Sequence, residues 1–400
     1  MKKTLLTICL VWMCFSLSAQ KIIDLSGKWS FSIDRQDNGE KEKWFSHTLN
    51  DFINLPGSMP EKQKGDEVTA KTQWTGSLYD SSYYYNPYME KYRKEGNIKF
   101  PFFLTPDKHY VGAAWYQKEV NIPADWKGER ILLFLERPHI ETTVWVNGQK
   151  TGMQNSLCVP HQYDITHYVR PGKCTITIRV DNRIKEINVG PDSHSITDQT
   201  QGNWNGIVGR ICLQTTPKTY FDDIQIYPEP EQKLARVKVV IKGTGTAKVK
   251  LSAESFNTDK KHIVPAIQQE IKLNKGVTET EMVLPMGNDM LLWDEFHPAL
   301  YKLKAEVTNG KKTEIKEIQF GMRRFEIKGK WFYVNGRKTQ LRGTVENCDF
   351  PLTGYAPMDV ESWERVFRIC RSYGLNHMRF HSFCPPEAAF MAADRVGFYL

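Results

Sequence analysis

The sequence predicts a multidomain protein: an all-β jelly-roll sandwich, an immunoglobulin-like β-sandwich, and then the truncated start of a (β/α)8 TIM barrel. Two observations support this fold class. Up to about residue 324, short segments alternate apolar and polar residues, which is typical of strands with one buried face. After residue 324 the pattern becomes strand, helix, strand, helix, strand, which indicates a parallel α/β array. The 400 residues are enough for several domains with cores of their own.

The jelly-roll domain is expected over residues 20–217. Thr142–Val146 alternates as a strand and is followed by Asn147-Gly148, a strong hairpin signal because both residues tolerate positive φ. Thr175–Val180 alternates in the same way, and no helical period of core length occurs in this part of the sequence. Several short strands with turn signals predict a two-sheet sandwich. The tyrosine-rich stretch Tyr79–Asn97 has little periodicity and is expected to be a long loop.

The second domain is expected over residues 218–324. Ala235–Ile241, Ala247–Ala253 and Ala299–Val307 alternate as strands. About one hundred residues with several short strands is the size of an immunoglobulin-like sandwich.

Residues 325–400 are expected to begin a barrel without completing it, since a whole (β/α)8 barrel needs about 250 residues. Gln340–Gly343, Leu375–Phe380 and Phe398–Leu400 are its expected strands. Asp359 is placed to cap a first helix that carries apolar residues at helical spacing, and Pro385-Pro386 to open a second that ends at Gly397.

The composition excludes several functional classes. The formal charge is +8, but Lys and Arg are spread among 46 acidic residues, so a mildly basic solvated surface explains the charge better than nucleic-acid binding does. The 11 Trp, 17 Tyr and 20 Phe fit strand-rich cores, and they also fit stacking on sugar rings. No cysteines form a C-x-x-C pair, so a zinc or redox centre has no support, and free buried thiols are expected.

The first nineteen residues have the pattern of a signal peptide. Lys2-Lys3 precede an apolar stretch, Leu5–Leu17, and Ser16–Ala19 offers small residues for cleavage before Gln20. The apolar stretch is too short for a transmembrane anchor, and no later segment of the sequence is long and apolar enough to be one. The sequence therefore predicts export to the periplasm or the extracellular space.

Polar residues follow the first two strands of the expected barrel, where the working groups of such barrels lie. These segments are Thr344–Gly354 and Arg379–Pro385. Solvated loop residues explain them about equally well on position alone. Arg379 is different, because an arginine in an apolar barrel strand is costly to bury unless a carboxylate pairs with it.

Several motifs in order resemble glycoside hydrolase family 2 over essentially the whole chain after the signal peptide. They are Ala114–Lys118, Val144–Gly148, Trp204–Arg210, Leu292–Tyr301, Phe332–Gly336, Leu341–Gly343, Gly374–Arg379 and Asp394–Tyr399. The resemblance implies an exo-acting, retaining β-glycosidase of the β-galactosidase/β-glucuronidase type, whose partner is a carbohydrate substrate. Such enzymes use one carboxylate as nucleophile and a second as acid/base. In this family both are glutamates in later barrel strands, so no catalytic residue is assigned and both are expected after Leu400.

Four substrate-binding residues follow from the resemblance. Arg379 matches the arginine that lies beside the family's nucleophile. His381 and Asn347 occupy sugar-facing positions, but both depart from the β-galactosidase pattern: the order His381-Ser382 is swapped, and Asn347 stands where a histidine is usual. Asp198, before Trp204, is the candidate from the first domain, and a solvated loop aspartate is the competing interpretation. The departures make galactose an uncertain substrate.

The competing function is a non-catalytic carbohydrate-binding or adhesion protein made of tandem sandwiches. The strand–helix–strand segment after Arg324 argues against it, because an adhesin of this kind has no need of that segment. No organic cofactor and no metal ligands are identified; some members of the family bind Mg²⁺, and its ligands are again expected after Leu400. The sugar, its linkage and any self-association stay open.

Overall fold

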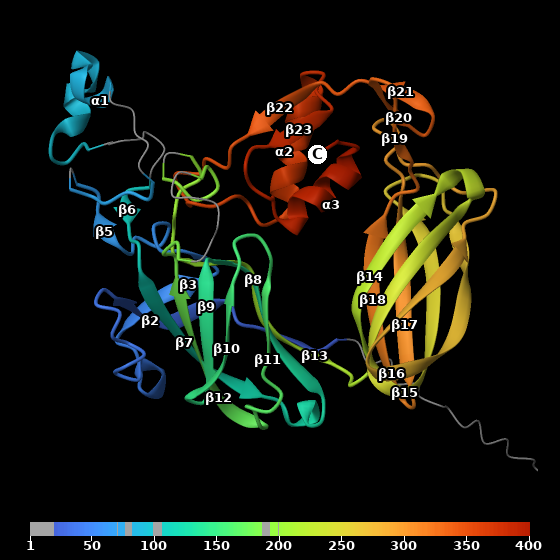
Figure 1. Ribbon diagram of the computed structural model, residues 1–400, viewed down its shortest axis with the longest axis horizontal. Coiled ribbons are helices and arrows are strands. Elements are labelled where there is room, and N and C mark those ends of the chain that lie inside the picture. Colours follow the sequence, from blue (N-terminus) through green and yellow to red (C-terminus); the bar gives the residue numbers. More distant parts are fainter. Residues whose placement is uncertain (1–19, 70, 77–81, 99–105, 186–192, 199) are drawn as a thin grey trace, which may run out of the picture.

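The computed structural model describes residues 20–69, 71–76, 82–98, 106–185, 193–198 and 200–400. These residues form two β-sandwiches and a smaller α/β unit (Figure 1). The predicted signal peptide, residues 1–19, lies outside the described residues. No helix in the described part of the chain is long and apolar enough to cross a membrane.

The first unit is a jelly-roll sandwich of two antiparallel sheets. One sheet contains, in spatial order, β1 (Ile22–Asp24), β13 (Gly206–Thr216), β8 (Arg130–His139) and β11 (His161–Asp164), with β4 (Gly57–Ser58) beside β13. The other contains β10 (Gln149–Asn155), β9 (Glu141–Val146), β12 (Gly172–Asp181), β7 (Ala113–Ile122), β2 (Gly27–Asp34) and β3 (Asp51–Leu55). Two short strands, β5 (Asp66–Glu67) and β6 (Lys108–His109), pair separately.

The core of this sandwich follows from the alternation in its strands. Trp29 and Phe31 of β2 point inward beside Tyr116 of β7, and all three side chains are buried in one cluster. The expected hairpin is confirmed, because Gln149 of β10 pairs with Val146 of β9. Its turn is Asn147-Gly148, with φ angles of 51° and 78°.

The stretch Tyr79–Asn97 is not a simple loop. In its described part it forms a helical turn, α1 (Ser82–Tyr85), and a 3-10 helix, η2 (Pro87–Arg93). The Asn86 side chain accepts a 3.0 Å hydrogen bond from the Tyr88 N–H, and Pro87 occupies the first helical position. The sequence did not predict these turns, because each is too short to show the repeat of apolar residues that indicates a helix. Two further 3-10 turns of the unit are η1 (Trp44–Ser46) and η3 (Ala124–Trp126).

The second unit is immunoglobulin-like and contains β14 (Tyr220–Glu229), β15 (Leu234–Phe256), β16 (Ile263–Pro285), β17 (Leu300–Asn309) and β18 (Lys312–Phe320), with η4 (Pro230–Gln232) before β15. The first part of β15 pairs with β14, and its last part pairs with β17. The register shifts between Gly243 and Gly245, where Gly245 has a φ of 84° that other residues rarely adopt. This bend lets one long strand serve both partners.

The third unit opens with a small sheet of β19 (Phe325–Lys328), β20 (Trp331–Val334) and β21 (Arg337–Thr339). The turn Asn335-Gly336 joins its last two strands. Then follow β22 (Gly343–Glu346), α2 (Val360–Ser372), β23 (His377–Phe380) and α3 (Glu387–Val396). β22 and β23 are parallel, and a further parallel bridge joins His377 to Tyr399.

Both predicted helices are confirmed. Asp359 caps α2 by accepting a 2.7 Å hydrogen bond from the Ser362 N–H, and α3 ends at Gly397 with a φ of 76°. Trp363 and Phe367 of α2 are buried against α3 and against Met378 of β23.

The first expected strand of this unit was misplaced. Gln340–Gly343 was the predicted range, but β22 begins at Gly343. At Arg342 the amide N–H bonds to the Asn376 side chain and the carbonyl accepts from the Asn376 N–H. This clasp holds the chain beside β23 before the regular ladder starts.

Candidate functional site

The candidate site lies at the carboxyl ends of the parallel strands β22 and β23. Asn347 follows β22 directly, and Arg379 and His381 lie at the end of β23. The His381 N–H donates a 2.8 Å hydrogen bond to the carbonyl of Glu346, the last residue of β22, so the ladder continues one residue past the end of β23. The structure therefore brings three of the four predicted sugar-contacting residues to one edge.

The two faces of this strand pair differ. Met378 and Phe380 face α2 and α3, where they join the apolar cluster of the unit. Val345 and Arg379, which are paired in register, lie on the opposite face, and both are exposed. The sequence argument took Arg379 to be a buried arginine in need of a carboxylate. In the described part of the chain Arg379 forms no ion pair, because no element covers this face of the strands.

Two carboxyl groups lie close to the strand ends. The Glu346 side chain accepts a 2.8 Å hydrogen bond from the Cys348 N–H, which fixes the start of the loop after β22. Burial, together with the nearby charge of Glu346, raises the pKa of Asp349 to about 6. The Glu346 carboxylate is thus held in a local turn, and the raised pKa of Asp349 favours the protonated form of its carboxyl group.

His381 is held from the other side by the first sandwich. The Gln201 side-chain amide donates a 2.6 Å hydrogen bond to the His381 carbonyl, and the Nδ1 atoms of His194 and His381 lie 3.4 Å apart. The Arg137 guanidinium donates to the Cys384 carbonyl at 2.5 Å. The loop after β23 is therefore fixed by side chains of the first sandwich that lie 180 to 247 residues away in the sequence.

Asp198, the fourth predicted residue, lies apart from the strand ends and is buried. Its Oδ2 atom accepts from the Thr75 N–H at 2.7 Å and lies 3.2 Å from His109 Nε2. Its Oδ1 atom accepts from the Asn203 N–H at 3.1 Å. These partners join three segments of the first unit, and a sugar-binding role for Asp198 stays a prediction.

Trp204 forms an aromatic contact between the first and third units. Its ring stacks on His139 with centroids 4.5 Å apart and meets Tyr355 at 5.6 Å. Burial lowers the pKa of His139 to about 3, so the imidazole that faces Trp204 is neutral. The Ser58 hydroxyl, which also belongs to the first unit, donates to the Thr353 carbonyl.

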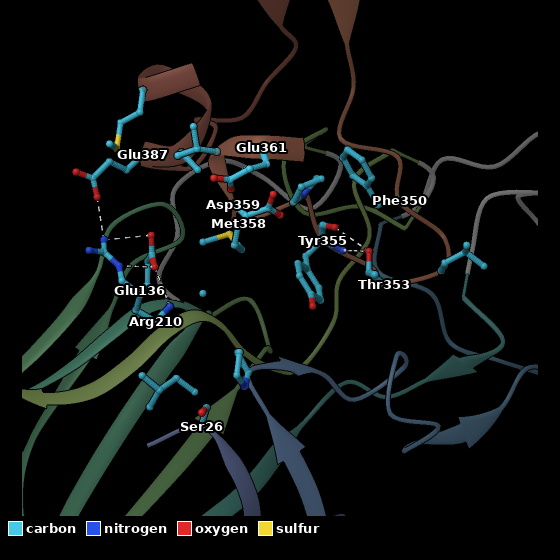
Figure 2. A pocket seen from close by; sticks show the side chains of 18 of the residues that line it. Ser26, Glu136, Arg210, Phe350, Thr353, Tyr355, Met358, Asp359, Glu361 and Glu387 are labelled. Carbon is cyan, nitrogen blue, oxygen red and sulfur yellow. Dashed lines mark hydrogen bonds and ion pairs between the residues drawn. The ribbon is translucent and has the colours of Figure 1, made fainter. Parts of the chain in front are cut away.

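A cleft of about 1030 Å³ opens beside this contact (Figure 2). Glu136, Arg210 and Glu387 form an ion-pair chain along one side of it, and Tyr355 lies toward the other side (Figure 2). None of the four predicted sugar-contacting residues lines this cleft. Its lining includes Asp349, so the cleft borders the strand-end site.

Within the described ranges, no group of three or more His, Cys, Asp or Glu side chains is arranged to hold a metal ion. All six described cysteines are free thiols. Cys174 and Cys212 are buried as expected, whereas Cys384 is exposed, so the expectation of buried thiols holds only in part.

Sequence reasoning missed His194 and Gln201. Both lie in the polar segment before Trp204, where neither residue type nor spacing singles them out. Their approach to His381 depends on how two domains dock, and no local pattern reports that.

Two family models match the chain. The model for "Glycosyl hydrolases family 2, sugar binding domain" matches residues 22–217, and the model for "Glycosyl hydrolases family 2" matches residues 219–323. The matched ranges correspond to the two sandwiches.

The curated relatives that resemble this chain include β-glucuronidases and β-galactosidases. Human β-glucuronidase is 24% identical over 409 residues, which cover 94% of this chain and 56% of the human protein. A β-galactosidase from Thermoanaerobacter pseudethanolicus is 24% identical over 320 residues, covering 75% of this chain and 40% of the relative. The chain thus spans about half the length of the curated relatives it matches. The match to the crystal structure of Ruminococcus gnavus β-glucuronidase covers 95% of this chain and 58% of the Ruminococcus chain. The TM-score is 0.69 at 19% sequence identity, which shows a shared fold. The chain belongs to glycoside hydrolase family 2.

Proposed function

We propose that the intact protein is an exo-acting, retaining β-glycosidase that removes terminal sugars from oligo- or polysaccharides, and that residues 325–400 begin its TIM-barrel catalytic domain. The observation that carries the proposal is the parallel pair β22–β23, whose one face packs on α2 and α3 while the other presents Val345 and Arg379 uncovered. A barrel wall has this construction, with helices outside and working side chains inside.

The two catalytic glutamates are proposed to lie after Leu400. Glu346, the glutamate nearest to the strand ends, is bonded to the Cys348 N–H and precedes Asn347 instead of following an asparagine. Arg379 is proposed to contact the nucleophile and to favour its ionised form. His381, Asn347 and Asp198 remain the proposed sugar-binding residues.

The substrate class is tested with chromogenic β-glycosides on the intact protein. The useful panel is galactoside, glucoside and glucuronide, since the last two differ only in the carboxylate at C6. Release from one of them supports the proposal and names the sugar. A mannoside and an arabinopyranoside extend the panel. If the protein releases none of these sugars but still binds sugar, the result would instead support a non-catalytic carbohydrate-binding protein.

The stereochemistry gives a second test of the same proposal. A retaining enzyme passes through a covalent glycosyl intermediate, so the first product is the β-anomer. Proton NMR of the anomeric signals during early turnover should show the β form before mutarotation. The α form appearing first would contradict the retaining mechanism.

We also propose that the protein is exported with cleavage before Gln20, because residues 1–19 have a basic start, an apolar stretch and a small-residue cleavage site. N-terminal sequencing of the protein recovered from its native cell should give Gln20 as the first residue. A mature chain that begins at Met1 would rule this out.

A further inference from the structure

A loop of the first sandwich, described over residues 193–198 and 200–205, reaches the candidate site. It lies between β12 and β13, and its Gln201 and His194 side chains both meet His381, which follows β23. The imidazole rings of His194 and His381 have centroids 5.0 Å apart at an angle of 33°. Their Nδ1 atoms lie 3.4 Å apart. Two imidazoles from different domains thus lie together at the strand end.

The imidazole of His194 is not needed to shape this loop. The loop is held by the His194 carbonyl, which accepts from the Thr200 hydroxyl at 2.6 Å, and by the Asp198 carboxylate, which accepts from the Asn203 N–H. Near His381 the loop docks onto the third unit through Gln201, whose side chain is buried with only 8% exposure. His194 itself is exposed, and in the described residues its ring has its one hydrogen-bond contact with His381.

We propose that His194 is a substrate-binding residue supplied by the sandwich domain, and that with His381 it hydrogen-bonds hydroxyl groups of the sugar at the barrel mouth. This inference rests on the proposed glycosidase function. A neutral imidazole has one donor and one acceptor nitrogen, and the two Nδ1 atoms face each other, so one of them donates and the other accepts. This leaves the Nε2 atom of one ring as an acceptor and that of the other as a donor for neighbouring hydroxyls. The ligand class is therefore a terminal pyranose with adjacent free hydroxyl groups.

The arrangement also assigns a role to the contact between the units. Gln201 fixes the backbone of His381, and His194 comes from the same loop, so the spacing of the two rings is set by domain docking. A sugar that bridges both rings would bind to two domains at once. Rigid placement of this kind lowers the entropy lost on binding.

The test uses the intact protein and three variants. His194→Ala removes the ring, His194→Asn restores one donor and one acceptor, and His167→Ala removes an exposed histidine that lines a different cavity of the same sandwich. KM and kcat are measured on the glycoside that the wild type releases, and the melting temperature of each variant is measured alongside.

Loss of one hydrogen bond to a neutral hydroxyl predicts a KM about 2- to 10-fold higher for His194→Ala, with kcat nearly unchanged. His194→Asn should recover part of this loss, and His167→Ala should match the wild type. Melting temperatures should be the same for all three variants, which separates binding from a structural role. A KM for His194→Ala equal to that of the wild type would overturn the inference and leave the glycosidase proposal intact.

If the wild type releases no sugar from any glycoside, the glycosidase proposal fails, and His194 is then tested by binding alone. Galactose and glucuronic acid are titrated into histidine-labelled protein, and the ring signals are followed by ¹H–¹⁵N NMR. The signal that disappears in His194→Ala identifies this residue. A shift of that signal with either sugar supports the inference, and no shift with both overturns it.

Discussion

Trp204 of the first sandwich and Tyr355 of the loop after β22 lie with their ring centroids 5.6 Å apart, and this contact joins the first unit to the third. The indole also stacks on the His139 ring, with centroids 4.5 Å apart. Gly354 lies beside the indole with a φ of 82°, a backbone conformation that residues with a side chain rarely adopt. Trp204, which belongs to a family motif in the sequence, therefore packs the first sandwich against the loop that follows β22.

Replacing Trp204 with alanine should destabilise this contact severely. The side chain is only 6% exposed, and truncation of a buried tryptophan costs about 3–5 kcal/mol through lost burial and the cavity left behind. Denaturant unfolding of the variant should show this loss. Trp331→Ala is the matched control, because Trp331 of β20 is 40% exposed and should cost much less. Equal costs for the two variants would contradict the role given to Trp204.

Asp198→Asn should destabilise the first sandwich. Both carboxylate oxygens accept hydrogen bonds from backbone N–H groups, and an asparagine offers only one oxygen, so one N–H would face an NH₂ group. Leaving such a buried donor unpaired costs about 1–3 kcal/mol. Thermal unfolding measures the loss. Unchanged stability with a raised KM would instead favour the direct sugar contact that the family resemblance suggested.

The pKa of Asp349 predicts a dependence of stability on pH. Burial and the neighbouring Glu346 raise this pKa to about 6, whereas an aspartate in the unfolded chain has a pKa of about 3.9. The folded state therefore binds the proton more tightly, so the contribution of this group is present below about pH 4 and is lost as the pH rises to about 6. Asp349→Asn should raise the unfolding free energy more at pH 7.5 than at pH 4.5.

Denaturant titrations at both pH values check this prediction. Glu361→Gln is the control, because Glu361 lines the same cleft with an exposed side chain. It should show no comparable difference between the two pH values. An Asp349→Asn variant whose effect is the same at pH 4.5 and pH 7.5 would show that Asp349 does not titrate in this range.

Local signals explain why much of the fold could be predicted. Asn147-Gly148 and Asn335-Gly336 form hairpin turns, because asparagine and glycine tolerate the positive φ angles that such turns need. Asp359 caps α2, as its position predicts. Each of these features depends on a few neighbouring residues. The parallel pairing of β22 with β23 also follows from local order, because a strand that returns through a helix pairs in parallel.

Features that depend on distant contacts could not be predicted. The start of β22 is set by the clasp between Arg342 and Asn376, and the side chain of Asp198 turns inward because Thr75 and Asn203 approach it from other segments. The meeting of His194 with His381 needs the docking of two domains. Sequence periodicity reports which face of a strand is buried, and it says nothing about which other domain will meet the strand end.

The most direct test of the central claim is the effect of Arg379→Ala on kcat/KM in the intact protein, with the best glycoside of the panel as substrate. Arg379 lies on the face of β23 that points away from the apolar cluster shared with α2 and α3, so its removal takes no contact from that cluster. The melting temperature of the variant is measured alongside to separate a loss of activity from a loss of folding. Removing one charge-stabilising group from an active site typically costs about 10²–10³ in kcat. The account predicts a loss of that size in kcat/KM. Activity within about twofold of the wild type would contradict the assignment of this edge as the catalytic centre.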